Sequence, residues 1–347
     1  MSNPSPSNYE YWSNKCVFIT GATGIVGSWL TRTLLDAGAE VVALVRDYEP
    51  SSELIRSGTI QRCTVVNGEL ENIQVLERTL SHYECDTVFH LAAQTIVGTA
   101  LRAPLLTFES NIRGTYNLLE ACRRQRESIQ RIVMASSDKA YGSSPTLPYD
   151  ESMPLQGRHP YDVSKSCKDL ISRAYFETYQ LPLVIARCGN IYGGGDLNFS
   201  RLIPGTIKAL WSHNTPQIRS NGKYTRDYVF IDDAVDAYLS MGQALDDMSH
   251  WGEAYNFGPQ QPVSVLEVVS TLQRLMHCED CHPEILDHAD HEIEHQYLCA
   301  KKAKTQLGWE AKYSLEEGLQ KTIDWYINFL EQKNKFSSSN HHLTNAK

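Results

Sequence analysis

The sequence has no long apolar run, no excess of positive charge and no dense set of paired cysteines. No stretch approaches the roughly 20 apolar residues that cross a bilayer, and the opening MSNPSPSNYEYW has neither the basic start nor the apolar centre of a signal peptide. The net charge of −9 argues against nucleic acid or an anionic membrane as the main partner. We therefore expect a cytoplasmic protein that binds neither, and whose nine cysteines are reduced thiols.

The sequence also has only one Cys-x-x-Cys pair, formed by Cys278 and Cys281 within a histidine-rich segment at 277–295. Structural zinc sites normally need two closed ligand pairs at suitable spacing. The segment lies in the part of the chain that we assign to substrate binding. We therefore expect no metal site.

Short apolar runs alternate with amphipathic runs through the first 190 residues. The pattern predicts strands at 16–22, 40–46, 86–93, 131–137 and 181–190, and helices at 28–38, 75–83, 115–125 and 161–179. Strands rich in Val, Ile and Leu that alternate with helices indicate a parallel sheet covered on both faces. From about residue 189 the chain becomes rich in Gly, Asn and Pro, with isolated helices. The sequence therefore predicts an α/β protein with a doubly wound parallel sheet and a smaller C-terminal domain.

Three glycines, Gly21, Gly24 and Gly27, follow the first predicted strand at a spacing of three. Glycines let the backbone turn tightly and approach a pyrophosphate, whose charge meets free N–H groups at the start of a helix. A structural turn explains a lone glycine triplet about as well. Its position after the first strand of a doubly wound sheet favours a dinucleotide site.

The second strand ends in Val45, Arg46 and Asp47. An acid at the end of this strand favours NAD, because it accepts a hydrogen bond from the ribose 2′-hydroxyl, whereas an arginine favours the 2′-phosphate of NADP. Arg46 favours NADP slightly, and Asp47 is compatible with NAD. An exposed loop arginine would give the same pattern.

Tyr161 and Lys165 lie four residues apart at the start of a predicted helix, which places them on one face, one turn apart. A phenol with a pKa near 10 is a poor base at neutral pH. A nearby cation favours the phenolate, and each pKa unit takes about 1.4 kcal/mol of differential stabilisation. The pair is common by chance, but its combination with the glycine turn and with a strand that ends in Ser136 and Ser137 is specific.

Together these motifs resemble the extended short-chain dehydrogenase/reductase family that acts on nucleotide sugars. The similarity covers roughly residues 11–330 and includes GEL (68–70), HLAAQ (90–94), NIRGTYNL (111–118), RCGNIYGGGD (187–196), RDYVFIDDA (226–234), NFGP (256–259) and LGWEAKYSLEEGLQKTIDWY (307–326). The resemblance implies a Rossmann-type domain at 14–188 plus about 226–258. It also implies a sugar-nucleotide-binding domain at about 189–225 plus 259–332, with flexible tails at 1–10 and 335–347. The helices at 115–125 and 161–179 would form the interface of a homodimer.

The resemblance also implies roles for individual residues. A tightly bound NAD or NADP would contact Gly21, Thr23, Gly24, Ile25, Val26, Gly27, Arg46, Glu69, Leu70, Leu91, Ala92, Ala93, Gln94, Asn111, Tyr161 and Lys165. A nucleoside-diphosphate sugar would contact Gln94, Ser137, Asn190, Arg201, Leu202 and Arg226. The arginines would hold the diphosphate, because guanidinium groups match phosphate oxygens.

Asp138 and Lys139 follow Ser137 directly. Alone they read as a solvated loop, but within this family the hexose 4-epimerases carry small or apolar residues here and the sugar-nucleotide 4,6-dehydratases carry an acid/base pair. SSDKAYG (136–142) together with GGGDLNFSRLIP (193–204) most resembles CDP-glucose 4,6-dehydratases. The resemblance therefore implies a lyase whose catalytic residues are Ser137, Asp138, Lys139, Tyr161 and Lys165.

Two other functions compete with the dehydratase. A 4-epimerase shares the oxidation step, and a non-catalytic regulator would have lost the tyrosine or the lysine. The roles within the acid/base pair also stay open. An ammonium beside a carboxylate normally keeps its proton, which suggests Lys139 as the acid, and desolvation would reverse that assignment.

Overall fold

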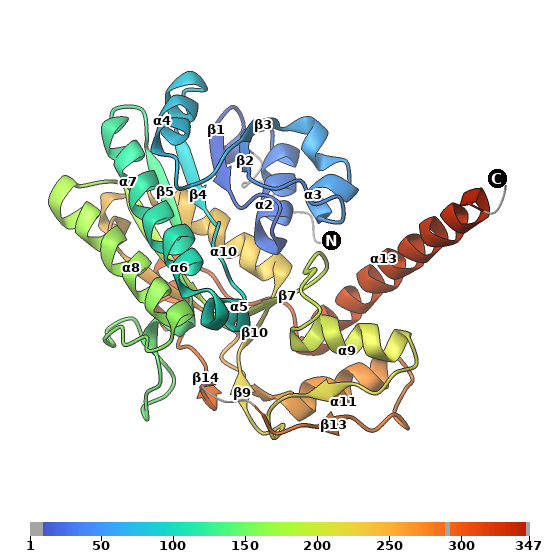
Figure 1. Ribbon diagram of the computed structural model, residues 1–347. Coiled ribbons are helices and arrows are strands. Elements are labelled where there is room, and N and C mark those ends of the chain that lie inside the picture. Colours follow the sequence, from blue (N-terminus) through green and yellow to red (C-terminus); the bar gives the residue numbers. More distant parts are fainter. Residues whose placement is uncertain (1–9, 289–291, 345–347) are drawn as a thin grey trace.

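The computed structural model describes residues 10–288 and 292–344, and its centre is a seven-stranded sheet (Figure 1). The strand order is β11-β6-β5-β4-β1-β2-β3, and every pair in this sheet is parallel. The strands are β1 (Cys16–Thr20), β2 (Glu40–Val45), β3 (Thr64–Asn67), β4 (Thr87–His90), β5 (Arg131–Ala135), β6 (Leu183–Cys188) and β11 (Ala254–Phe257). The order reverses between β1 and β4, which is where doubly wound sheets bind their ligands.

Helices cover both faces of this sheet (Figure 1). On one face lie α2 (Ile25–Asp36), α3 (Glu53–Arg56) and α10 (Ile231–Ala244), and on the other α4 (Ile73–His82), α7 (Gly114–Arg124) and α8 (Pro160–Tyr179). Because successive strand residues point to opposite faces, Val17 and Ile19 join the first apolar core and Phe18 joins the second. The predicted doubly wound α/β fold is confirmed.

The remaining elements form smaller sheets and helices outside the main sheet. The small sheets pair β7 (Asn190–Tyr192) with β10 (Tyr228–Phe230), β8 (Gln217–Ile218) with β13 (Glu284–Ile285), and β9 (Thr225–Arg226) with both β12 (Val263–Ser264) and β14 (His295–Gln296). The helices are α5 (Val97–Arg102), α6 (Pro104–Phe108), α9 (Leu202–Trp211), α11 (Val265–Leu275) and α12 (Lys301–Leu307), with single turns at Thr59–Arg62, Glu109–Arg113, Asp138–Tyr141 and Met248–His250.

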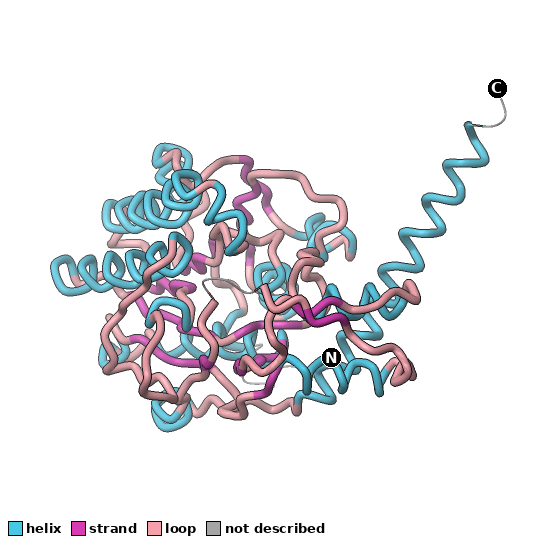
Figure 2. The backbone as a smooth tube through the Cα atoms, turned by 60° about the horizontal axis from the view of Figure 1, so that its bottom comes forward, coloured by secondary structure: helices cyan, strands magenta, loops and turns pink. Residues whose placement is uncertain are grey.

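The last helix, α13 (Leu315–Thr344), packs at its beginning and extends away from the body at its end (Figure 2). Leu319, Ile323 and Tyr326 are buried along its first half. The backbone of α13 is helical to Thr344 and so extends into the stretch 335–347 that we expected to be a flexible tail. Residues 1–9 and 345–347 of the expected tails lie outside the described residues. Among the described helices, none has the length and apolar character needed to cross a membrane.

Candidate active site

The glycine turn after β1 forms a cradle in which side chains have no room. A Cβ on Gly21, whose φ is +75°, would lie 2.6 Å from the amide nitrogen of Ala92, and a Cβ on Gly27 would lie 2.0 Å from the Gly21 carbonyl oxygen. Gly24 caps α2 without a side-chain hydrogen bond, and no acidic residue lies in the first turn. The first-turn amides of a helix lack intrahelical partners, so this cradle of Gly21, Thr23, Gly24, Ile25, Val26 and Gly27 fits a pyrophosphate.

The end of β2 carries charges of both signs. Arg46 donates from Nε to Asp47 Oδ2 at 2.6 Å, and both side chains are exposed. Glu69 is exposed on the neighbouring β3 end and Leu70 is buried. Because Asp47 balances the charge of Arg46, this edge fits a neutral 2′-hydroxyl better than a 2′-phosphate.

The segment after β4 is tied to the start of α8 through Asn111. Leu91, Ala92, Ala93 and Gln94 are half-buried. Asn111 accepts from Gln94 N at 2.7 Å, and its Nδ2 donates to Gln94 O at 3.0 Å and to Ser164 Oγ at 2.9 Å. Ser164 in turn donates to the Tyr161 carbonyl at 2.7 Å. Asn111 therefore fixes the wall of the cofactor cradle relative to the catalytic helix.

Tyr161 and Lys165 lie on one face of α8, as their spacing predicts. Lys165 Nζ is 5.8 Å from the centre of the Tyr161 ring and donates to the Ala135 carbonyl at the end of β5 at 3.2 Å. Burial lowers the pKa of Lys165 to about 8. We expected this cation to lower the pKa of Tyr161, but burial raises that pKa to about 12, and the positive charge that opposes the rise is Arg201.

Asp138 and Lys139 open the single turn Asp138–Tyr141, so the solvated-loop interpretation is wrong. Ser137 caps this turn: its Oγ accepts from Lys139 N at 3.2 Å and donates to Asp138 Oδ1 at 2.9 Å. Asp138 is only 2% exposed. Burial raises the pKa of Asp138, with Lys139 opposing the rise, and burial followed by the charge of Arg226 lowers the pKa of Lys139. Both groups are shifted toward their neutral forms.

Three of the predicted substrate residues, Asn190, Arg201 and Leu202, lie on or beside β7 and α9, whereas Gln94 and Ser137 follow strands of the main sheet. Arg201 precedes Leu202, the first residue of α9, pairs with Asp196 at 3.0 Å and reaches Thr95 Oγ1 at 3.2 Å. Asn190 opens β7, and its N–H donates to the Asp227 carbonyl at 2.9 Å.

Arg226 was expected to hold the diphosphate, and its guanidinium group is engaged within the protein. It is buried and donates to the backbone carbonyls of Thr225, Ile293 and Glu294. Its charge also lowers the pKa of Lys139. Arg226 therefore orders the 293–294 backbone and acts electrostatically on the acid/base turn.

Sequence reasoning missed three buried ionisable groups on α8, which are Asp162, Lys168 and Asp169. Asp162 is 6% exposed, and burial raises its pKa against the charge of Lys139. Lys168 is 1% exposed, donates to the His90 carbonyl at 3.4 Å, and has a pKa far below its usual value because of burial and of Lys165. The signal was available, since Asp162 follows Tyr161 directly and Lys168 is one helical turn beyond Lys165.

The buried carboxyl group of Asp227, in the RDYVFIDDA motif, is expected to make the free energy of unfolding depend on pH. Its Oδ2 accepts from Leu298 N at 2.7 Å, and its buried Oδ1 has no hydrogen-bond partner among the described residues. Burial raises its pKa from 3.8 to about 7. Between these values the native state binds more protons than the unfolded state, so stability falls as the pH rises. At about 1.4 kcal/mol per pKa unit, the loss is roughly 4 kcal/mol.

Urea unfolding between pH 4 and pH 8 tests this prediction. The Asp227→Asn variant is expected to lose most of the decline, whereas Asp280→Asn, which alters an exposed carboxyl group, is expected to keep it. An equal decline in Asp227→Asn and the wild type would contradict the prediction.

All nine cysteines are free thiols. Cys278 Sγ donates to the Met276 carbonyl at 3.3 Å, and Cys281 Sγ to the Asn214 carbonyl at 3.8 Å. Among the described residues, no three His, Cys, Asp or Glu side chains are grouped so that they hold a metal ion. Residues 289–291 of this segment lie outside that description.

The parallel sheet, the glycine cradle and the Tyr161–Lys165 pair define a short-chain dehydrogenase/reductase of the extended type. The chain belongs to the family described as GDP-mannose 4,6 dehydratase, which it matches over residues 18–322.

Sequence and structural similarity to individual relatives supports this assignment. The chain is 30% identical to the CDP-glucose 4,6-dehydratase of Salmonella typhimurium, over 91% of this chain and 92% of that protein. The structure of the UDP-glucose 4-epimerase of Thermotoga maritima with UDP-glucose is similar with a TM-score of 0.83 and 26% identity, covering 91% of this chain and 99% of that one. The dTDP-glucose 4,6-dehydratase of Bacillus anthracis in complex with NAD has a TM-score of 0.80 and 27% identity, covering 90% and 97%.

Proposed function

We propose that the protein is a nucleotide-sugar 4,6-dehydratase that converts a nucleoside-diphosphate hexose, with CDP-glucose favoured, to its 4-keto-6-deoxy sugar. The observation that carries this proposal is the Asp138–Lys139 pair directly after Ser137, in which Asp138 is buried and Lys139 is half-buried. Loss of water needs an acid and a base near adjacent carbons, whereas epimerisation needs only return of the hydride to the other face. The 30% identity to a CDP-glucose 4,6-dehydratase supports the choice of nucleotide.

The oxidation step uses the tyrosine. A nicotinamide cofactor held at the glycine cradle of Gly21, Gly24 and Gly27 would supply the hydride chemistry, taking up hydride from C4 of the sugar and later delivering it to C6. Tyr161 takes the proton of the 4-hydroxyl as the C4–O bond becomes a ketone, and Ser137 positions that hydroxyl. The charge of Arg201 favours the phenolate of Tyr161, and Lys165 is held near the tyrosine ring by the Ala135 carbonyl.

The elimination step uses the acid/base turn. The new ketone acidifies the C5 proton, which Lys139 accepts in its amine form. Asp138 in its carboxylic acid form gives its proton to the 6-hydroxyl as the C6–O bond breaks, so that water leaves. When hydride reaches C6, the Lys139 ammonium returns its proton to C5, and Tyr161 releases the 4-hydroxyl proton through solvent as Asp138 takes one up. The directions of both pKa shifts support this assignment, which reverses the one that a simple ion pair would suggest.

NAD is the cofactor that we propose, against the lean toward NADP from Arg46 alone. The Arg46–Asp47 contact at 2.6 Å supports it, because a 2′-phosphate would have to displace Asp47. The dehydratase structure from Bacillus anthracis is a complex with NAD, which agrees. Denaturing the purified protein and identifying the released nucleotide tests this choice, and NADP alone would overturn it.

Incubation with a panel of nucleoside-diphosphate hexoses, followed by mass spectrometry of the products, tests the function. Loss of one water with CDP-glucose is the expected result. Unchanged mass with inverted C4 would instead identify an epimerase, which the similarity to the Thermotoga maritima enzyme keeps as the second candidate. No turnover of any sugar would favour a regulator.

The arrangement of the chain supports two further parts of the proposal. The position of α10 and β11 with the seven-stranded sheet supports a nucleotide lobe at 14–188 plus about 226–258, and the β8–β13 pair supports a sugar-nucleotide lobe at about 189–225 plus 259–332. The nine free thiols support a reducing, cytoplasmic location.

A homodimer through α7 and α8 is the expected assembly. Large apolar side chains are exposed on α6, α7 and α8, which lie side by side (Figure 1): Leu106 is 68% exposed, Leu170 56% and Tyr116 41%. Exposed apolar patches of this kind mark interaction surfaces. Light scattering is therefore expected to give twice the chain mass of 39.2 kDa.

Leu170→Glu is expected to shift this protein toward the monomer, because it places a charge in the proposed interface. Met248→Glu alters a side chain that is also exposed, at 67% compared with 56% for Leu170, but lies on the Met248–His250 turn, and it serves as the control. A monomeric wild type, or a dimer that both substitutions leave intact, would contradict the proposed interface.

A further inference from the structure

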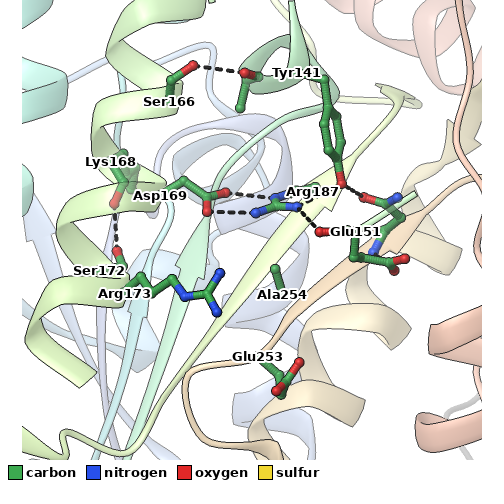
Figure 3. A network of polar contacts seen from close by, with 12 residues as sticks. Tyr141, Glu151, Ser166, Lys168, Asp169, Ser172, Arg173, Arg187, Glu253 and Ala254 are labelled. Carbon is green, nitrogen blue, oxygen red and sulfur yellow. Dashed lines mark hydrogen bonds and ion pairs between the residues drawn. The ribbon is translucent and has the colours of Figure 1, made fainter. Parts of the chain in front are cut away.

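A buried polar network contacts the turn that carries Asp138 and Lys139 through the side chain of Tyr141 (Figure 3). Tyr141 is the last residue of this turn and is 2% exposed. Its hydroxyl group accepts a hydrogen bond from Arg187 Nη1 at 2.8 Å and donates one to Asn256 Oδ1 at 2.8 Å. The turn is therefore attached through one side chain to both β6 and β11.

Arg187 is itself fixed by a carboxylate on the catalytic helix. Its Nε and Nη2 donate to the two oxygens of Asp169, both at 2.8 Å (Figure 3). Arg187 is 5% exposed and Asp169 is 2% exposed. Asp169 lies four residues beyond Lys165, so one helix carries both the oxidation residues and the anchor of this network. A two-pronged guanidinium–carboxylate contact fixes orientation as well as distance.

Two more contacts hold the backbone of the turn. Ser166 of α8 donates from Oγ to the Ala140 carbonyl at 2.8 Å, and Tyr149 donates from its hydroxyl group to the Gly142 carbonyl at 2.6 Å. Three separate attachments thus converge on residues 140–142. By contrast, the Asp138 carboxyl group accepts a hydrogen bond from Ser137, the residue that caps the same turn.

We propose that Tyr141 and Arg187 are positioning residues for the elimination step, which hold the 138–142 turn so that the Asp138 and Lys139 side chains meet the C5–C6 bond of the sugar. A buried ion pair contributes little net stability compared with apolar residues, because desolvation offsets its attraction. The network instead fixes the orientation of the turn, because its hydrogen bonds join the turn to the catalytic helix. The inference rests on the proposed dehydratase function.

Tyr141→Phe tests the proposal, because it removes one hydroxyl group and keeps the ring. Oxidation at C4 uses Tyr161 and Lys165 on α8, and single-turnover cofactor reduction is expected to stay within about twofold of wild type. Loss of water is expected to slow by about tenfold or more, since a misplacement of 1 Å can cost about 10²-fold. The backbone amides of residues 138–142 are expected to exchange hydrogen faster, whereas those of the α8 core are unchanged.

Tyr255→Phe is the matched control. Tyr255 precedes Asn256 on β11, is fully buried, and points to the opposite face, where its hydroxyl group contacts His250 at 2.7 Å and Gln306 at 2.8 Å. Its loss is expected to lower thermal stability without changing the ratio of elimination to oxidation. If Tyr141→Phe and Tyr255→Phe slow both steps equally, the network is structural only and the proposal is wrong.

Ser166→Ala provides a second, independent variant should Tyr141→Phe fold poorly. It removes the contact to the Ala140 carbonyl and is expected to change the same ratio in the same direction. Failure of the proposed function looks different from failure of this inference: the wild type would then eliminate no water from any sugar of the panel. Normal elimination by the wild type and by both variants would overturn the positioning role alone.

Discussion

Replacing Tyr161 with phenylalanine is expected to lower turnover by about 10²–10⁴-fold, the usual contribution of a positioned acid/base group. The phenol is the group that we propose to accept the 4-hydroxyl proton, and its ring centre lies 5.8 Å from Lys165 Nζ. Without that transfer the ketone does not form, and neither elimination nor return of the hydride follows. Steady-state assays with the best sugar of the panel measure the loss, and single-turnover cofactor reduction assigns it to the first step.

The control for this prediction must separate chemistry from stability. Tyr161 is 9% exposed and Tyr255 is fully buried, so removing either hydroxyl group perturbs a packed tyrosine. Tyr255→Phe is expected to keep turnover within a few-fold of wild type. Unimpaired cofactor reduction in Tyr161→Phe would show that another group accepts the proton, and the assignment of Tyr161 would be abandoned.

The parts of this site that the sequence predicts are those with local spacing. Tyr161 and Lys165 are one helical turn apart, and Gly21 and Gly27 bracket one strand-to-helix turn, so their geometry follows from the secondary structure alone. The sheet was predictable for the same reason, since each strand and helix shows its own periodicity.

The parts that the sequence does not predict depend on contacts between distant residues. Arg187 meets Asp169 across 18 positions and Tyr141 across 46, and no periodicity reports such a pair. Burial also decides the protonation states. A lysine next to an aspartate suggests an ion pair, and only the packing around Asp138 and Lys139 shifts both toward neutrality.

Several charged side chains interact electrostatically around the turn that carries Asp138 and Lys139. Asp138, Lys139 and Asp162 influence one another's pKa values, the charge of Arg226 lowers those of Asp138 and Lys139, and desolvation is the largest cause of each of the three shifts. Each charged group stabilises the ionised form of an opposite neighbour, so no single substitution changes one group alone. Experiments on the acid/base pair therefore need a readout for each chemical step.

Substituting Lys139 and Asp138 separately is expected to divide the elimination into its two proton transfers. Lys139→Met removes the proposed base: cofactor reduction persists, but exchange of the C5 proton with deuterium oxide and loss of water both fall by about 10²–10⁴-fold. Asp138→Asn removes the proposed acid: C5 exchange persists, because Lys139 still takes that proton, while loss of water falls by a similar factor. Nuclear magnetic resonance follows the exchange and mass spectrometry follows the water.

The assignment of acid and base depends on which chemical step each variant loses, and not on the size of either loss. Lys301→Met alters an exposed lysine on α12 and is expected to leave every step unchanged. If C5 exchange survives in Lys139→Met and disappears in Asp138→Asn, then Asp138 is the base and Lys139 the acid, and the roles derived from burial are reversed. If both variants dehydrate at the wild-type rate, the pair takes no part in elimination. In that case Ser137, Tyr161 and Lys165 remain as the common machinery of oxidation, and the observation that separates a dehydratase from an epimerase in this chain is lost.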